Sequence, residues 1–344
     1  MNGSSRPVVT RGRVITAVTL TVLLAVIVAI VALPSLRDPL VSAPADEVQP
    51  DIESATFPLT GLPADVLPER PALLVKVSNS PEARPQTGLD RADVVFEELT
   101  EGGVTRFIAV FHSQVPDVVG PVRSARPVDA QIMSGFGYPG FAYSGARAEV
   151  RSQLALVPAV ALTEGAPGFF RDAGQYASHP VAPHNLFLRT EEALRAVSDA
   201  GAQPLGELGW VFGEPPPDGA EPGETVSIAM SESFTTAWHY ESSDGRYRRQ
   251  QNGLPSAVTG SGEIGAANVV VLDVRHYIGA SGYPETDVLG AGPAVVLRDG
   301  ERFAARWSKP QATDPLLILT ADGSTTFPLK PGPTWIHLPD RLPD

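Results

Sequence analysis

The feature that most constrains this sequence is an apolar run of 20 residues at 14–33, which contains no charged residue, glycine or proline. A helix that rises 1.5 Å per residue would cross a hydrocarbon core of ~30 Å over this length. A cleaved signal peptide normally has a shorter apolar region of ~7–15 residues, followed closely by a cleavage site between small residues. The nearest such site, at residues 43–45, lies far downstream and contains a proline. We therefore predict an uncleaved transmembrane helix over 14–33.

The charges around this run predict its orientation. Arg6, Arg11 and Arg13 precede it without any acid, whereas acidic residues predominate in the segment that follows. Under the positive-inside rule, residues 1–13 form a cytoplasmic stub and the rest of the chain lies outside the membrane. The expected location is therefore the cell membrane, with a single span and extracytoplasmic domains.

The net charge and the lack of cysteine exclude several classes of function. The chain has 344 residues with 26 Lys+Arg and 39 Asp+Glu, and the part from Pro34 onward carries a net charge of −16. A body this acidic repels phosphates on average, so we predict no nucleic-acid partner. Since there is no cysteine, disulfides, thiolate metal sites, a cysteine nucleophile and a lipid-modified N-terminal cysteine are excluded.

The exported part is predicted to have an α+β fold in two domains. Residues 34–56 mix Pro, Ala, Ser and acids without apolar periodicity, as a flexible tether would. Residues 57–212 alternate strand-like and helix-like stretches, and 224–342 follow a Gly- and Pro-rich linker at 213–223. Strands are expected at 72–77, 93–99, 104–112, 141–144 and 159–163, and helices at 146–156 and 190–200, the second with Thr190 as its N-cap.

Three Asp-Gly pairs indicate a mainly antiparallel second domain. They lie at 244–245, 299–300 and 322–323, between β-branched or aromatic runs. Asp-Gly readily adopts the positive φ angles of a two-residue hairpin turn. The most buried strand of this domain is predicted at 268–274.

Charged residues inside the hairpin predicted around Gly102-Gly103 are candidates for a site. With a two-residue turn, residues whose numbers sum to 205 would face each other. This register places Glu97 diagonal to Arg106 and leaves Glu98 without a partner on its own face. A buried Glu97–Arg106 ion pair is the structural interpretation, and a cleft containing Glu98 and Arg106 is the functional one.

A second basic cluster contains Arg123 and Arg126 without an intervening acid. Ser124 is predicted to cap a helix whose first turn would lie beside both arginines, and such a site suits a phosphate or a carboxylate. Ion pairing with the acidic body is the alternative.

His179 and His184 lie five residues apart, but Pro180 and Pro183 prevent a helix between them. We expect His184 and Asn185 to make turn or capping hydrogen bonds, and we predict no metal and no cofactor. The common nucleophile, zinc and nucleotide-binding motifs are absent from the sequence.

Several segments together resemble the YerB-like family of bacterial extracytoplasmic proteins, a family of unknown function with N- and C-terminal domains. The resemblance implies export and a two-domain body over about residues 56–340, and it supplies no reaction. Family members elsewhere look like lipoproteins, whereas a chain without cysteine must be anchored by its helix. The segments are PLTGL at 58–62, RP at 70–71, KVSN at 76–79, ARPQTGL at 83–89, ADVVFEE at 92–98, EGGVTRF at 101–107, GPVRSAR at 120–126 and PGPTWIHL at 331–338.

Residues 89–94, with the nearby arginines, also resemble the arginine and aspartate clusters of LytR-CpsA-Psr enzymes, which transfer glycopolymers from polyprenyl pyrophosphate. Val94 stands where that motif has threonine. This resemblance implies the alternative function, an envelope enzyme acting on a phosphorylated or glycan substrate.

We therefore expect a membrane-anchored binding module without catalytic activity, whose ligand is a cell-wall component or an envelope protein. The candidate binding residues are Arg84, Gln86, Glu97, Glu98, Arg106, Arg123, Ser124, Arg126, His184 and Asn185.

Overall fold

The computed structural model describes residues 55–260, 262–279 and 282–343. The described residues form one compact unit. Among the described residues, no helix is long and apolar enough to cross a membrane. The predicted stub at 1–13, the predicted span at 14–33 and nearly all of the predicted tether lie outside the described residues, so they stay predictions.

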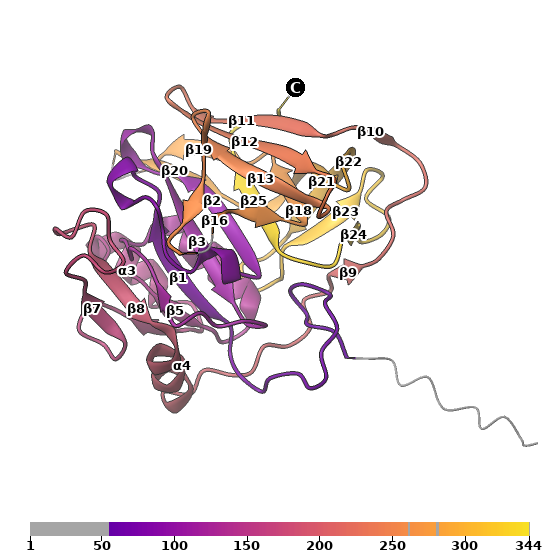
Figure 1. Cartoon of the computed structure of the whole chain (residues 1–344). Coiled ribbons are helices and arrows are strands. Elements are labelled where there is room, and N and C mark those ends of the chain that lie inside the picture. Colours follow the sequence, from indigo (N-terminus) through magenta and orange to yellow (C-terminus); the bar gives the residue numbers. More distant parts are fainter. Residues whose placement is uncertain (1–54, 261, 280–281, 344) are drawn as a thin grey trace, which may run out of the picture. The chain divides into compact units, whose positions relative to one another are not determined.

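An 11-stranded mixed sheet forms the centre of the unit (Figure 1). Most of its pairs are antiparallel, but β25 runs parallel to both of its neighbours. In spatial order the strands are β10 (Ala220–Pro222), β22 (Glu301–Lys309), β21 (Gly290–Arg298), β18 (Asn268–Leu272), β25 (Thr334–Leu338), β2 (Val94–Leu99), β3 (Thr105–Phe111), β1 (Leu73–Ser78), β5 (Gly140–Ala142) and β6 (Val160–Leu162), and β23 (Leu317–Thr320) pairs with β22.

The central strands are buried on both faces because each face is covered by a different layer. All residues of β1, β18 and β25 are buried. Strands covered on both sides read as nearly continuous apolar runs rather than as alternating ones, which explains LLVKVS in β1 and NVVVL in β18.

One face, here called the helix face, packs against α2 (Pro127–Met133) and α3 (Ala148–Leu154). Its core joins Val94 and Phe96 of β2 to Val128 and Ile132 of α2.

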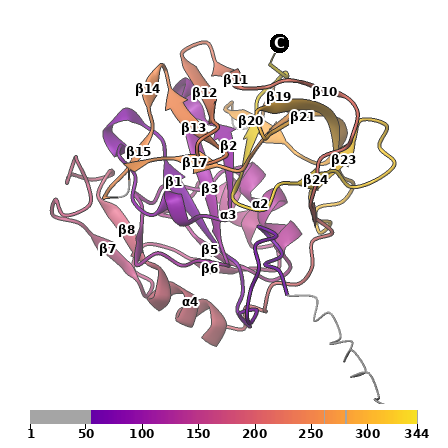
Figure 2. The same ribbon diagram turned by 45° about the vertical axis from the view of Figure 1, so that its right-hand side comes forward.

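The opposite face, here called the sheet face, packs against a second sheet and α4 (Thr190–Asp199). The second sheet has the order β11 (Thr225–Ser231), β12 (Phe234–Glu241), β13 (Arg246–Gln251) and β14 (Leu254–Pro255), with β17 (Gly265–Ala266) on β13. In both views α4 lies at the end of the large sheet that contains β5 and β6 (Figures 1 and 2).

The remaining elements are short. They are the sheet of β4 (Val118–Val119), β8 (Leu186–Arg189) and β7 (Phe169–Arg171), the pairs β15 (Ala257–Val258) with β16 (Gly262–Glu263), β19 (Arg275–Ile278) with β20 (Pro284–Asp287), and β24 (Pro328–Leu329) with β9 (Val211–Phe212), and the 3₁₀ turns η2 (Pro81–Ala83), η3 (Leu89–Arg91), η4 (Glu101–Gly103) and η5 (Ser134–Phe136).

Most predicted elements are present, with ends that move by one to three residues. The prediction of α+β structure is confirmed at the level of a mixed fold, in which strands far outnumber helices. Asp299 and Gly300 both have positive φ and form the predicted two-residue turn between β21 and β22. The N-cap prediction is wrong: Arg189 is the N-cap of α4, and the Thr190 hydroxyl donates to the carbonyl of Pro116 instead.

The predicted register of the β2–β3 hairpin is also wrong, by one residue. Glu98 pairs with Arg106 and Glu97 pairs with Phe107, because the connection contains the extra residues of η4 rather than a two-residue turn. A one-residue shift moves each side chain relative to its cross-strand partners. Glu97 therefore lies on the sheet face, while Glu98 and Arg106 share the helix face.

The two predicted sequence regions share one sheet. Strand β25, from the end of the chain, lies between β18 and β2 and pairs with both. Within the predicted linker at 213–223, β10 pairs with β22. The residues from both regions thus meet along β2, where the candidate site residues lie.

Candidate functional site

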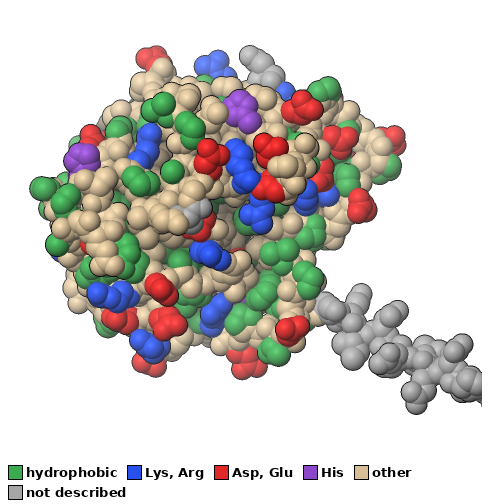
Figure 3. Space-filling model, in the orientation of Figure 1, with side chains coloured by type: hydrophobic (Ala, Val, Ile, Leu, Met, Phe, Trp, Pro, Cys, Tyr) green, Lys and Arg blue, Asp and Glu red, His purple; other side chains and the backbone are tan. Residues whose placement is uncertain are grey.

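The side chains of the adjacent residues Glu97 and Glu98 contact different charged clusters on opposite faces of the sheet. Both side chains are fully buried, which is costly for a carboxylate unless it is paired or protonated. On the exposed surface, by contrast, basic and acidic side chains are intermingled over the view of Figure 3. We therefore look for the functional site among the buried charged clusters rather than among the exposed charges.

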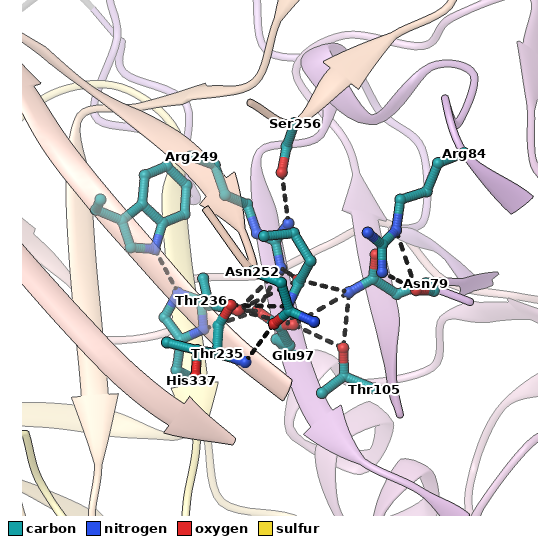
Figure 4. Close-up of polar contacts among 12 residues, drawn as sticks. Asn79, Arg84, Glu97, Thr105, Thr235, Thr236, Arg249, Asn252, Ser256 and His337 are labelled. Carbon is teal, nitrogen blue, oxygen red and sulfur yellow. Dashed lines mark hydrogen bonds and ion pairs between the residues drawn. The ribbon is translucent and has the colours of Figure 1, made fainter. Parts of the chain in front are cut away.

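Glu97 is the centre of a hydrogen-bonded network on the sheet face (Figure 4). The Arg249 Nη2 atom lies 2.8 Å from Glu97 Oε1 and 3.0 Å from Oε2, and the Thr105 hydroxyl donates to Oε1 at 2.7 Å. Asn79 donates to the same carboxylate at 3.2 Å, and Thr236 does so at 3.1 Å. We call this set, together with Gln251 and His337, the Glu97 network. Its members come from six strands or their ends, so it ties the two sheets together.

His337 in this network cannot act as a general base. Its Nε2 accepts a hydrogen bond from the indole N–H of Trp238 at 2.9 Å, and its Nδ1 lies 3.0 Å from Glu97 Oε2. Because an indole nitrogen only donates, Nε2 carries no proton, and the proton of the neutral ring is on Nδ1 facing Glu97. Burial lowers the pKa of His337, in agreement with a neutral ring. Both ring nitrogens thus face groups inside the protein, Nε2 through a hydrogen bond and Nδ1 through a close contact.

The charge of Glu97 is well compensated. Burial alone would raise the pKa of this carboxyl, but Arg249 and the hydrogen bonds from His337 and Thr105 outweigh it and hold the pKa well below its usual value. The negative charge of Glu97 is balanced by the positive charge of Arg249, and the imidazole of His337 adds no charge. The network has the properties of a closed structural core.

On the helix face, Glu98 belongs to a buried triad with Lys76 and Asp129. The Lys76 ammonium contacts Glu98 Oε1, and it lies 2.7 Å from Asp129 Oδ1. Asp129 also accepts from the backbone N–H of Arg126 at 2.8 Å, while Glu98 Oε2 has no hydrogen-bond partner among the described residues. Two carboxylates share one cation, so burial and the charge of Asp129 raise the pKa of Glu98 to about 7.

Beside this triad lie Arg106, Arg123 and Arg126, which we call the arginine cluster. Arg106 projects from β3, and the other two precede α2. Arg106 donates to the carbonyl oxygen of Ser124 at 2.7 Å but makes no ion pair with any carboxylate that the structure describes, and Arg126 Nε lies 2.9 Å from Glu101 Oε2. Among the described residues, the Arg123 side chain has neither a hydrogen bond nor an ion pair, and its Nε is buried.

These guanidinium groups are close enough to affect one another. Burial, together with the charges of Arg126 and Arg123, lowers the pKa of Arg106 to about 10. Burial and Arg126 also lower the pKa of Arg123. Partly buried like charges with too few counter-charges form a site that an anion would stabilise.

The predicted binding residues therefore separate into groups. Glu98, Arg106, Arg123, Ser124 and Arg126 come together on the helix face, and Glu97, Arg84 and Gln86 belong to the sheet-face side. Arg84 donates to the carbonyl of Asn79 at 2.8 Å, and Gln86 donates to the Asn79 side chain at 3.2 Å.

Two predictions about these groups are wrong. The Glu97–Arg106 ion pair is absent because the two residues lie on opposite faces. Ser124 is not a helix cap either, because α2 begins at Pro127 with Arg126 as its N-cap. The Asp129 carboxylate accepts from the Arg126 N–H in that first turn, so the helix end is not itself the anion site.

The expected turn hydrogen bonds of the 178–185 segment are confirmed. The Asn185 side chain donates to the carbonyls of Asp172 and Pro180, each at 3.2 Å. The His184 Nδ1 lies 3.5 Å from the Ser80 hydroxyl, and burial and the charge of Arg123 lower the pKa of His184. Across the described parts of the chain, no three His, Asp or Glu side chains are grouped as metal ligands would be.

Lys76, Asp129 and Arg249 were not singled out from the sequence. Lys76 gives the clearest signal, since it is one of only three lysines and interrupts the apolar run ALLVKV. Arg249 lies in the strand RYRRQQ together with Arg246 and Arg248. Nothing in the sequence indicates that Arg249 is the buried one of these three arginines.

Comparison with known proteins agrees with the sequence resemblance. The family model "Protein of unknown function (DUF3048) N-terminal domain" matches residues 59–203, and the model of the DUF3048 C-terminal domain matches residues 226–336. "Putative lipoprotein YerB" of Bacillus subtilis (strain 168) is 28% identical over 310 residues, which cover 87% of this chain and 91% of that protein. The crystal structure of the Bacillus subtilis YerB protein superimposes with a TM-score of 0.73 at 27% identity, covering 84% of this chain and 97% of that one.

Proposed function

The chain belongs to the YerB-like (DUF3048) family, and from that premise we propose that it is a non-catalytic binding module that holds an anionic group of a cell-envelope component at the arginine cluster. The observation that carries the proposal is that Arg106, which donates to the carbonyl oxygen of Ser124, and Arg123, the residue before Ser124, are both partly buried and make no ion pair with a carboxylate among the described residues.

The charge balance of the chain supports this function. With 39 acidic residues against 26 basic ones, a carboxylate partner for each arginine would be easy to supply. Leaving two guanidinium groups unpaired beside a third is unfavourable in the free protein, and a bound phosphate or carboxylate removes that cost through charge-assisted hydrogen bonds. Perturbed groups of this kind are typical of functional sites.

The proposed location is the outer side of the cell membrane. The apolar run at 14–33 and the arginines before it support a single span with an extracytoplasmic body. The name of the Bacillus relative describes that protein as a lipoprotein, which is consistent with an extracytoplasmic site for this chain. A component of the cell wall or another envelope protein would then be within reach of the arginine cluster.

Phosphate binding by the full-length protein in detergent tests the proposal. We expect inorganic phosphate to bind, and we expect Arg106→Gln and Arg123→Gln each to weaken it about tenfold or more, because each removes charge-assisted hydrogen bonds of ~1.5–3 kcal/mol. Arg195→Gln is the matched control, since this arginine lies on α4 with an exposed side chain. If both cluster variants bound phosphate as the wild type does, the site assignment would be wrong.

The alternative, an envelope enzyme, has one observation in its favour, which is the pKa of about 7 that makes Glu98 a possible base beside Arg106. Its carboxylate is fully buried and held by Lys76, so it does not reach a ligand at the arginines. Turnover of lipid-linked or wall-derived phosphate esters by the purified protein, lost in Glu98→Gln, would instead support catalysis.

A further inference from the structure

The arginine cluster continues through Glu101 to a fourth arginine. Glu101 Oε2 accepts from Arg126 Nε at 2.9 Å, and Glu101 Oε1 lies 3.0 Å from Arg147 Nη2. One carboxylate thus bridges two arginines from different segments and neutralises part of their charge. Arg147 is thereby held at a fixed position on the border of the cluster.

The guanidinium of Arg147 stacks on the ring of Tyr283, at 3.7 Å from the ring centroid. Tyr283 directly precedes β20 of the short β19–β20 pair. The chain after β20 is fixed to α2, because the backbone N–H of Val288 donates to the Gln131 side chain at 2.8 Å. Tyr283 therefore lies at the Arg147 end of the cluster, and the strand that follows it packs against α2.

Although one face of its ring is covered by Arg147, Tyr283 is 42% exposed. An exposed aromatic face next to cationic groups can stack on a flat apolar surface of a ligand whose anionic group the arginines bind. The ring lies against the charged group of Arg147, which in turn contacts the carboxylate of Glu101. An acyl chain would need an apolar groove here, whereas a sugar ring combines an apolar face with hydroxyl groups that suit charged neighbours.

We propose that the ligand of the arginine cluster is a sugar phosphate, whose phosphate is held by Arg106 and Arg123 and whose sugar ring stacks on Tyr283. This inference rests on the proposed anion site and names its ligand class. A sugar carrying a phosphate monoester or diester has both parts, and Tyr283 gives the site selectivity for phosphates that carry a sugar.

Calorimetric titration of the full-length protein in detergent at pH 8 tests this assignment, since phosphate monoesters with a second pKa near 6 are then dianions. The probes are methyl phosphate, butyl phosphate and glucose 1-phosphate, which have the same charged group. We expect glucose 1-phosphate to bind about five- to tenfold more tightly than either alkyl phosphate, the range expected of one aromatic stacking contact.

Tyr283→Ala should remove this preference and leave the affinity for methyl phosphate unchanged, whereas Tyr283→Phe should keep it. Tyr277→Ala is the matched control, because Tyr277 lies in the same pair of strands and is 38% exposed, but packs against Arg275 instead of Arg147. Its preference should equal that of the wild type.

The outcomes separate the two proposals. If methyl phosphate binds but glucose 1-phosphate gains nothing, or if Tyr283→Ala keeps the preference, the sugar-phosphate inference is overturned and the anion site stands. Equal affinity for butyl phosphate and glucose 1-phosphate overturns it as well, since Tyr283 would then be only an apolar contact. Failure of all three phosphates to bind overturns both proposals.

Discussion

Glu97 and Glu98 are neighbours in the sequence, yet the clusters around them differ in one decisive property. In the Glu97 network the carboxylate meets Arg249, a neutral His337 and several polar side chains, so that its charge and lone pairs are satisfied. Around Glu98 the charges are paired unevenly: one lysine contacts two carboxylates, and the nearby Arg106 and Arg123 make no direct ion pair with a carboxylate among the described residues. The difference indicates that full burial with complete partners marks structure, whereas unbalanced charge at a partly buried border marks a binding site.

The largest effect is expected from removing Glu97. Glu97→Ala leaves the guanidinium of Arg249, which is 1% exposed, without its carboxylate, and breaking a buried pair from one side costs ~3–5 kcal/mol. Urea denaturation would measure this loss. The double variant Glu97→Gln/Arg249→Met removes both charges and should recover most of it. If Glu97→Ala loses less than ~1 kcal/mol, the network is not a structural core.

A smaller effect, dependent on pH, is expected from Glu98. Its pKa rises from 4.5 to about 7 on folding, so the folded state holds this proton more tightly than the unfolded state does. The stability from Glu98 is therefore present below pH 4.5 and is lost as the pH rises to about 7.

Glu98→Gln lacks this titration. The variant should thus gain ~1–3 kcal/mol relative to the wild type between pH 5 and pH 8, at ~1.4 kcal/mol for each unit of pKa shift. Denaturation curves at several pH values would show the gain, and Glu191→Gln on exposed α4 is the control. A constant difference between wild type and Glu98→Gln would show that Glu98 is charged throughout this range.

The smallest effect on stability is expected at Arg123, in contrast to Glu97. Arg123→Gln breaks no ion pair and relieves the repulsion by Arg126, so the free energy of unfolding should change by less than ~0.5 kcal/mol. The same variant should lose phosphate binding, as described above. A stability loss above ~1 kcal/mol would show that Arg123 stabilises the fold, as Glu97 does.

Local patterns predicted much of the fold. The apolar runs identified β1, β2, β3 and β18, and the Asp299-Gly300 pair located a hairpin turn, because propensity and turn chemistry depend on near neighbours. The register of β2 with β3 was not predictable from the Gly-Gly pair alone, since the length of the connecting turn depends on its whole conformation. That one-residue difference moved Glu97 to the opposite face from Arg106.

The amino-acid sequence identified the candidate residues: two adjacent glutamates in an apolar strand, arginines without acids between them, and motifs of the YerB-like family. Only the tertiary structure decided their roles. Apart from Thr105, which is 8 positions from Glu97, the partners of Glu97 and Glu98 lie 18 to 240 positions away, such as Asn79 and His337, and no local pattern encodes a contact over that separation. Charge balance is a property of such assembled neighbours, and it is what distinguishes the closed Glu97 network from the unbalanced arginine cluster.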